Sequence, residues 1–355
     1  MTSLQVDHLF IRYRNTEAVH DLSFSLQSGE IGCLLGPSGC GKTTTLRSIA
    51  GFIEPHSGNV LLDNISVSRP GWMLPTEQRR IGMVFQDFAL FPHLNIADNI
   101  GFGLHTLTKN MRQQRINELL ELVGLPHLLL KYPHELSGGQ QQRIALARAI
   151  APRPHILLLD EPFSSIDIEL REQLAREVRN IIKQESITAL LVTHDQLEAF
   201  AVADHIGVMR AGRLHQWDTG YNLYHEPNDL FVADFIGQGT LVPGTVLENK
   251  RVETEFGIFG YSKTRESLTA GDTVHILVRP DDVIHDDLTP KIMAVVTEKA
   301  FRGADFLYTL RLPTGQALMC LAPSHHNHAI GEAIGIRLEL DHLVLFKGEP
   351  HCSVS

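Results

Sequence analysis

The chain has 355 residues, of which 43% are hydrophobic and 20% are charged, a composition that excludes general disorder and suits two domains. Its formal net charge is -10, from 31 Lys and Arg against 41 Asp and Glu, which excludes a chain-wide basic surface for nucleic acid. The sequence has neither a basic signal-peptide start nor an uninterrupted apolar run of ~18 residues, so we expect no membrane span and no export.

The cysteine content predicts no cross-linked scaffold. The chain contains four cysteines: Cys33, Cys40, Cys320 and Cys352. They form no Cys-x-x-Cys pair and match no His/Cys zinc spacing, so neither a disulfide framework nor a structural zinc site is predicted. A reducing cytosol is therefore the expected compartment.

The N-terminal part predicts a β layer followed by a strand, a glycine-rich loop and a helix. Residues 4–26 are strand-like and end in apolar residues that alternate with polar ones. The apolar run 31–35 predicts a short strand that leads into the loop 36–41, and residues 42–50 predict a helix that ends at Gly51.

The middle of the chain predicts a helical insertion inside a parallel sheet. Residues from about 95 to 150 have helical periodicity, whereas the apolar run 156–159 suits a strand that is covered on both faces. An amphipathic helix over 170–182 precedes the next strand, 188–192. This alternation predicts a parallel α/β sheet, whose ligands lie outside the carboxyl ends of its strands.

The C-terminal part has a different pattern of apolar and polar residues. We expect residues 1–239 to form one domain and residues 240–355 a separate small β-barrel-like domain, because little helical periodicity remains there. Its strand-like runs are 241–246, 274–278, 306–312 and 335–346.

The loop after the first apolar strand has the spacing of a phosphate-binding motif. Gly36 to Thr43 fits G-x-x-x-x-G-K-[ST] between a strand and a helix, which is the context this motif requires. Lys42 would reach the β and γ phosphates, and the Thr43 hydroxyl would bind Mg2+. Cys40 is either a reactive thiol near a helix start or a small filler residue, and the filler interpretation is preferred.

Two adjacent carboxylates end the apolar run 156–159. Asp160 suits a Mg2+ shell, and Glu161 suits a base that orients and deprotonates the water attacking the γ-phosphate. Such a pair on its own is an ordinary loop start. Its combination with the phosphate loop favours the catalytic interpretation.

A second helix start also has phosphate-binding chemistry. Residues 137–143 place Ser137 and two glycines before a helix. Taken alone, this is an N-cap with flexible glycines. Because the chain already has one phosphate loop, a second anion-binding helix end suggests a site that another subunit completes.

Four further features, three single residues and one histidine cluster, are ambiguous by themselves. His194 and Gln86 follow apolar runs and are either plain strand-end residues or γ-phosphate and Mg2+ contacts. Tyr13 is either a core aromatic or an adenine-stacking residue. The local cluster His325, His326 and His328 is expected by chance among 19 histidines, and whether it binds a metal is left open.

With these motifs assembled, the chain resembles, over essentially its whole length, the ATP-binding subunit of an ATP-binding cassette (ABC) importer. In that family the Walker A loop, the signature and Walker B correspond here to Gly36–Thr43, Leu136–Arg143 and Ile156–Pro162. The Q-loop, D-loop and switch-histidine positions are those of Gln86, Asp167 and His194. The segment 164–167 reads S-S-I-D instead of the more usual S-A-L-D or S-N-L-D, a small departure that bears on D-loop packing and leaves Asp167 in its place.

The resemblance implies a set of site residues. ATP would be held by Tyr13, Gly36, Pro37, Ser38, Gly39, Cys40, Gly41, Lys42, Thr43 and Thr44. The ATP of a partner copy would be held by Ser137, Gly138, Gly139 and Gln140. Mg2+ would be held by Thr43, Gln86 and Asp160, with Glu161 and His194 as the catalytic pair.

The same resemblance implies a fold and a cargo class. It implies a P-loop ABC ATPase domain with a parallel core sheet, an antiparallel β layer and a helical subdomain, followed by a TOBE/OB-type regulatory domain. Residues 276–282 resemble the TOBE domain of importers for sugars, polyamines, sulfate and ferric iron. Residues 132–135 and 235–239 are most similar to ferric-iron importer subunits, and the other cargoes stay open.

Partners follow from the resemblance as well. Two copies would sandwich two ATP molecules, and residues 88–94 would lie near a groove for a coupling helix of a membrane permease. The chain would be peripheral, at the cytoplasmic face of the bacterial inner membrane, and a periplasmic or extracellular substrate-binding protein would act through the permease. The permease and the regulatory ligand of residues 240–355 are not given by the sequence.

Soluble ABC-type ATPases that act on DNA or ribosomes are the main alternative. Those proteins show tandem cassettes or long coiled-coil insertions. This chain has one Walker A loop, about 50 residues between Gln86 and the signature, and a negative net charge. A simple P-loop kinase would leave the signature and His194 without a role.

Overall fold

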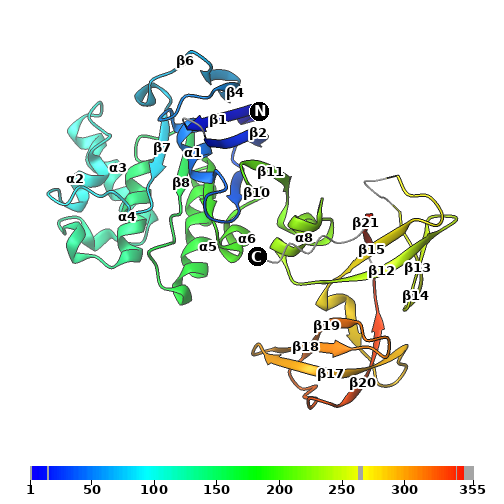
Figure 1. The fold of residues 1–355 in the computed structure, drawn as a ribbon. Coiled ribbons are helices and arrows are strands. Elements are labelled where there is room, and N and C mark those ends of the chain that lie inside the picture. The colour runs from blue at the N-terminus through cyan, green and yellow to red at the C-terminus, as the bar shows by residue number, and fades with distance from the viewer. Residues whose placement is uncertain (1, 14–15, 263–266, 341, 348–355) are drawn as a thin grey trace. The chain divides into compact units, whose positions relative to one another are not determined.

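The computed structural model describes residues 2–13, 16–262, 267–340 and 342–347. The chain divides into two compact units, Met1–Gly220 and Tyr221–Ser355, and Figure 1 shows the elements of each. Cys352 lies outside the described residues. No helix within them is long and apolar enough to cross a membrane.

The first unit begins with an antiparallel sheet, as the alternating pattern predicts. Its strand order is β2-β1-β4-β5-β6. The strands are β1 (Thr2–Tyr13), β2 (Thr16–Gln27), β4 (Ser57–Leu62), β5 (Ile65–Arg69) and β6 (Trp72–Met73). Alternate residues of β2, such as Leu22, Phe24 and Leu26, are buried, so one face of this sheet packs on the core.

The second sheet of this unit has the order β11-β10-β3-β9-β8-β7. Its strands are β3 (Ile31–Leu35), β7 (Ile81–Val84), β8 (Ile156–Asp160), β9 (Thr188–Thr193), β10 (His205–Arg210) and β11 (Arg213–Asp218). All neighbours pair in parallel except β10 with β11, which confirms the predicted parallel core. Every residue of β3, β8 and β9 is buried, as expected for strands covered on both faces.

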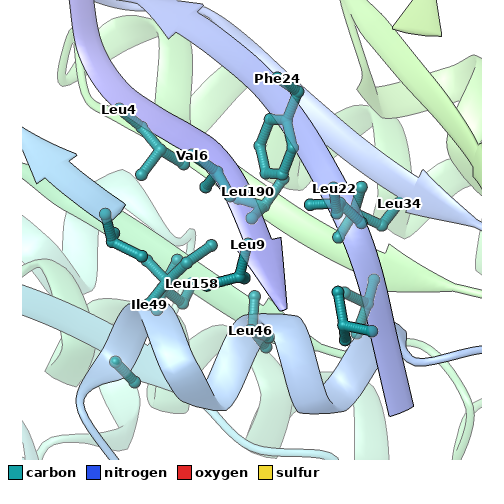
Figure 2. Close-up of a cluster of buried hydrophobic side chains, with 14 of the residues drawn as sticks. Leu4, Val6, Leu9, Leu22, Phe24, Leu34, Leu46, Ile49, Leu158 and Leu190 are labelled. Atoms are coloured by element: carbon teal, nitrogen blue, oxygen red, sulfur yellow. The ribbon is translucent and has the colours of Figure 1, made fainter. Parts of the chain in front are cut away.

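Helix α1 (Lys42–Ala50) packs between the two sheets. Figure 2 shows Leu46 and Ile49 of this helix beside Leu9 of β1, in the same cluster as Leu158 and Leu190 of the parallel sheet. The start of α1 is thereby held beside the carboxyl ends of β3, β8 and β9. Two further helices follow strands of this sheet in the chain: α5 (Ile168–Gln184) follows β8, and α6 (Gln196–Val202) follows β9.

Helices α2 (Ile96–Gly101), α3 (Lys109–Leu122) and α4 (Gly138–Ile150) pack against one another between β7 and β8 in the chain (Figure 1). The Thr108 side chain caps α3, and Gly124, with φ +71°, follows its end. Short 3-10 turns lie at Thr76–Gln78, Pro126–Leu128, Pro133–Glu135 and Pro280–Asp282.

The second unit begins with two short helices, α7 (Gly220–His225) and α8 (Leu230–Ile236). The buried Arg279 guanidinium donates hydrogen bonds to the carbonyl oxygens of Tyr224 at 3.1 Å, Ala233 at 2.9 Å and Gly237 at 2.6 Å. These bonds attach the two helices to the β-rich part of the chain. The second compact unit therefore begins before residue 240, where the sequence predicts the second domain to begin.

The rest of the second unit consists of two five-stranded sheets, ordered β14-β13-β12-β15-β21 and β16-β20-β17-β18-β19. The first contains β12 (Thr240–Leu247), β13 (Arg251–Thr254), β14 (Gly257–Gly260), β15 (Thr273–Val278) and β21 (Val344–Lys347). The second contains β16 (Val283–His285), β17 (Ile292–Phe301), β18 (Asp305–Arg311), β19 (Ala317–Pro323) and β20 (Ala333–Leu338). Because β16 also contacts β19, the second sheet is nearly closed, as a barrel-like domain requires.

One prediction for this region is wrong in detail. The run 335–346 was expected as one strand, but it contains parts of β20 and β21, which belong to different sheets. Both parts are apolar, and hydrophobicity alone does not show where a chain leaves one sheet for another.

Candidate active site

The phosphate loop lies tightly between neighbouring strands. Gly39 and Gly41 have φ values of +79° and +105°, a region that favours glycine. A Cβ atom at Gly41 would lie 2.5 Å from the carbonyl oxygen of Ala18, and one at Gly36 would lie 2.2 Å from that of Met209. Both close approaches exclude side chains, which explains the glycines of the motif in this chain.

Lys42 is the first residue of α1, and its ammonium group turns back over the loop. Its Nζ donates to the carbonyl oxygens of Gly36 at 2.7 Å and Pro37 at 3.0 Å. The side chain is largely buried, because the residue is 5% exposed. Lys42 therefore places a positive charge at the carboxyl end of β3, where the loop begins.

Cys40 has the environment of a filler residue. It is buried, and its Sγ lies 3.8 Å from Nζ of Lys42. Burial raises the pKa of this thiol despite the neighbouring cation, so the reactive thiolate form is disfavoured. Of the two interpretations left open by the sequence, the structure favours the inert one.

Thr43 and Asp160 meet although 117 positions separate them in the chain. The Thr43 hydroxyl donates to Oδ1 of Asp160 at 3.0 Å. Burial raises the pKa of the Asp160 carboxyl, and the hydrogen bond from Thr43 opposes this shift. A hydroxyl and a carboxylate beside each other are oxygen ligands of the kind that Mg2+ takes.

Glu161 and His194 form the second contact at this edge of the sheet. His194 Nδ1 lies 3.3 Å from Oε2 of Glu161, and the two side chains are 50% and 22% exposed. The backbone N–H of Glu161 donates to the carbonyl oxygen of Val192 at 3.0 Å. Glu161 has φ +44°, a costly conformation for this residue type, and such strain concentrates at functional sites.

Gln86 and Tyr13 lie at the ends of two further strands. Gln86 follows β7 and is exposed, and the parallel pairing of Val84 with Leu159 places it at the same sheet edge as Asp160. Tyr13 ends β1 and is 46% exposed, which contradicts the core interpretation. No hydrogen bond of either side chain with the phosphate loop is found within the described residues.

The signature segment forms a separate surface. The Ser137 hydroxyl accepts a bond from Gln140 N, and the Gln140 side chain accepts one from Ser137 N at 3.0 Å, so a capping box shapes the start of α4. Ser137 and Gly138 are exposed. This segment and Asp167 line a hollow of about 320 Å³, and none of residues 36–44 lines it. The structure thus places the sequence-predicted residues on two distinct surfaces of one unit.

Arg171 is a candidate functional residue that sequence reasoning missed. Its Nε donates to the Ile166 carbonyl at 2.8 Å, and Nη1 lies 4.0 Å from carboxylate oxygens of Asp195 and Glu198. Glu198, which also accepts a bond from Thr193, is buried. Arg171 therefore connects the segment beside Asp167 with the segment that follows His194. An Arg on an amphipathic helix looks like a surface residue in sequence, so no local signal marked it.

Arg148 of α4 was missed for the same reason. It donates to the carbonyl oxygens of Ala89 at 2.7 Å and Phe88 at 3.0 Å. Both acceptor residues have positive φ, +62° at Phe88 and +45° at Ala89. The signature helix thus holds the strained turn that follows Gln86.

Asn99 shapes the end of the same segment. It is fully buried and donates to the carbonyl oxygens of Phe91 at 3.1 Å and Leu94 at 3.0 Å, while its own side-chain oxygen accepts from Phe91 N at 2.9 Å. Residues 88–94 are therefore fixed at both ends by polar side chains from the helical insertion.

Comparison with protein families identifies both parts of the chain. Residues 19–164 match the ABC transporter family, and residues 276–346 match the TOBE domain. Among curated proteins, the chain is 42% identical over 280 residues to the Fe(3+) ions import ATP-binding protein FbpC of Haemophilus influenzae, covering 78% of this chain and 79% of that protein. It is 38% identical over 340 residues to an FbpC protein of Pectobacterium atrosepticum, covering 94% and 96%.

A polyamine importer subunit is also similar. The spermidine/putrescine import ATP-binding protein PotA of Nitrosospira multiformis is 42% identical over 350 residues, covering 94% of this chain and 93% of that protein. Overall identity therefore does not separate the two cargo classes.

Solved structures agree on the ATPase fold. CbiO1 of Clostridium perfringens, part of an ABC transporter complex, aligns with TM-score 0.59 and 28% identity, covering 64% of this chain and 92% of that one. A dimeric ATP-binding cassette bound to ADP and phosphate aligns with TM-score 0.54 and 29% identity, covering 61% and 98%. The chain belongs to the ATP-binding subunits of ABC importers, a family of ATPases, and it carries a TOBE domain after its ATP-binding part.

Proposed function

We propose that two copies of this chain bind ATP between them and hydrolyse it to drive import through a membrane permease. The observation that carries this proposal is the division of the anion-binding groups into two surfaces. Lys42, Thr43 and Asp160 gather at the sheet edge, whereas Ser137 and Gly138 lie exposed beside Asp167. A partner copy turned about a two-fold axis would bring one surface of each kind to every nucleotide.

Mg2+ would be held by Thr43, Asp160 and Gln86. The fit rests on the Thr43 hydroxyl and the Asp160 carboxylate, two oxygen groups 3.0 Å apart at the phosphate loop. When bound, the ion would offset negative charge on the β and γ phosphates. Lys42, at the head of α1, would add a second positive charge to the same oxygens.

Glu161 is the proposed base. Its carboxylate would accept the proton of the water that attacks the γ-phosphate, while the backbone bond to Val192 fixes the residue against β9. His194, 3.3 Å from that carboxylate, would orient it and contact the γ-phosphate. Tyr13 would stack on adenine through its exposed ring.

The helical insertion would transmit the closure of the two copies around ATP to the permease. Residues 88–94 are held by Arg148 and Asn99, and Arg148 belongs to the same helix as the signature. Movement of that helix when ATP binds would therefore move the turn after Gln86. We place the permease contact at this turn, with the chain peripheral at the cytoplasmic face of the bacterial inner membrane.

Ferric iron is the proposed cargo. The FbpC relatives support it, as do residues 132–135 and 235–239. The PotA relatives favour polyamines as a second candidate. A substrate-binding protein outside the membrane would deliver either cargo to the permease.

Uptake measurements separate the two cargoes. Cells that lack this subunit should lose uptake of radiolabelled ferric iron and keep uptake of spermidine, sulfate and sugars. Restoration by the wild-type chain but not by Glu161→Gln would link uptake to hydrolysis. Unchanged iron uptake together with lost spermidine uptake would replace the proposed cargo by the second candidate.

A further inference from the structure

Three histidines of the second unit bring one ring nitrogen each to within 4.8 Å of the others. His285 ends β16, and His326 and His328 lie in the connection between β19 and β20. His325, which is adjacent in sequence, is exposed and does not belong to the group. No other group of three potential metal-binding side chains is found in the part of the chain that the structure describes.

In two of these three rings, one ring nitrogen forms a hydrogen bond with a carboxylate. His285 Nε2 lies 2.9 Å from Oδ2 of Asp287, and His328 Nδ1 lies 2.9 Å from Oε1 of Glu332. Histidines that bind metals commonly donate their second ring nitrogen to a carboxylate in this way. The hydrogen bonds leave Nδ1 of His285 and Nε2 of His328 as the nitrogens that can bind an ion.

The second ring nitrogen of His328, Nε2, is a buried polar atom without a hydrogen-bond partner among the described residues. The side chains of His285 and His328 are only 8% and 14% exposed. A buried nitrogen without a partner is costly, and an ion bound there would remove the cost.

Tyr308 holds the backbone around the group. This residue is fully buried, and its hydroxyl donates to the His326 carbonyl at 2.6 Å and accepts from His328 N at 3.1 Å. The β-sheet fixes His285 through the pairing of β16 with β20. Two rigid supports therefore hold the three rings near each other before any ion binds, which lowers the cost of assembling a site.

We propose that His285, His326 and His328 bind one divalent first-row transition-metal ion, represented by Zn2+. Imidazole nitrogens suit Zn2+, Cu2+, Ni2+ and Fe2+, whereas Mg2+ and Ca2+ prefer oxygen ligands. Three protein ligands leave a fourth tetrahedral position for water. Zn–N bonds of ~2.0–2.1 Å place tetrahedral ligands about 3.4 Å apart, so the rings close in by roughly an ångström on binding.

This site goes beyond ATP hydrolysis and import, since neither requires it. It would tie the connection between β19 and β20, which carries His326 and His328, to the end of β16. The ion would thus stabilise the second, nearly closed sheet of the TOBE-containing unit. Its effect should appear as metal-dependent thermal stability.

The test is a Zn2+ titration of the full-length protein, freed of metal and nucleotide, in competition with a chromophoric chelator. Wild-type protein should bind one equivalent more tightly than the His326→Ala variant by at least about 100-fold. The matched control is His325→Ala, which changes the neighbouring exposed histidine and should bind as the wild type does. Asp287→Asn should lower the affinity about tenfold.

A second measurement, the unfolding temperature with and without metal ions, and a second variant at His326 complete the test. Zn2+ should raise the unfolding temperature of the wild type and of His325→Ala, but not that of His326→Ala or His326→Gln, and Mg2+ should raise none of them. The glutamine variant serves if the alanine variant unfolds without metal. Equal Zn2+ binding by the wild type and the His326 variants, or no binding by the wild type, would overturn the proposal.

Discussion

The two proposed anion-binding surfaces of the first unit are built in opposite ways. The phosphate loop is held by internal contacts: Lys42 binds two loop carbonyls, Gly41 lies against Ala18, and Thr43 binds Asp160. The signature segment is held by its own capping box, and its Ser137 and Gly138 stay exposed. One surface is completed within the chain, whereas the other stays exposed at a helix start, where the first backbone N–H groups have no partner within the helix.

This difference supports the proposal that activity depends on a partner copy. The phosphate loop alone would bind ATP, because its charges and oxygen groups converge on one sheet edge. Hydrolysis would need the second surface, which only another copy can supply. Substitutions on the two surfaces should therefore separate ATP binding from ATP turnover.

The largest effect is expected from Glu161→Gln. The amide keeps the shape of the carboxylate but cannot accept a proton, so turnover should fall by about 10^2- to 10^4-fold while ATP affinity is retained. Steady-state phosphate release and equilibrium nucleotide binding measure the two quantities. Glu169→Gln, at an exposed position in the first turn of α5, is the matched control. Near-normal turnover of Glu161→Gln would refute the assigned base.

Gly138→Asp should have the next largest effect. A Cβ atom at Gly138 would lie 3.7 Å from the carbonyl oxygen of Ser165, an ordinary contact, so the substitution fits the monomer. Its carboxylate would repel the triphosphate held by the partner, and we expect turnover to fall on the order of 100-fold with unchanged ATP affinity.

Gly138→Ala is the control for the added Cβ and should keep most of the turnover. The same two assays, phosphate release and ATP binding, are applied to both variants. A loss of ATP affinity in Gly138→Asp monomers would place the signature in the chain's own nucleotide site and would contradict the division into two surfaces.

Lys42→Ala should instead weaken ATP binding itself. Loss of a charged hydrogen bond of ~1.5–3 kcal/mol corresponds to an affinity lower by about 10- to 100-fold. Lys109→Ala, at the exposed start of α3, provides the control. Equilibrium titration with a fluorescent ATP analogue measures the change, and an unaltered affinity would count against the loop assignment.

The smallest effect is expected at Tyr13. Stacking of a base on an aromatic ring contributes ~1–3 kcal/mol, and at this half-exposed ring the lower end predicts a loss in ATP affinity of about fivefold for Tyr13→Ala. Tyr13→Phe keeps the ring and should bind ATP as the wild type does. If both variants bind equally well, the ring does not contact adenine.

Contiguous motifs were the most predictable part of the molecule. The strand, glycine loop and helix at 31–50 follow each other directly, so their pattern alone indicated the phosphate loop. The carboxyl ends of β8 and β9 were predictable as well, because parallel strands place Asp160, Glu161 and His194 at one edge.

Contacts between distant segments were not predictable. Arg148 reaches Phe88 across 60 positions and Arg171 reaches Glu198 across 27, yet in sequence each is an ordinary charged residue on a helix. His285 joins His326 and His328 only because β16 lies beside β20 in the folded sheet. The cargo is also weakly encoded, since an ATPase subunit of this kind acts on it through a permease.

Site-specific cross-linking is the sharpest test of the proposed ATP site, which the phosphate loop of one copy and the signature segment of the other would form together. Cysteine replaces exposed Ser38 in one tagged chain and exposed Ser137 in a second, differently tagged chain, both with Glu161→Gln and Cys352→Ser; the thiols of Cys33, Cys40 and Cys320 are buried. With ATP and a short thiol cross-linker, we expect a covalent product that carries both tags and does not form without nucleotide. If ATP gives no mixed-tag product, while a single chain with both cysteines cross-links internally, the nucleotide is enclosed by one copy, and the proposal of a site shared between two copies is wrong.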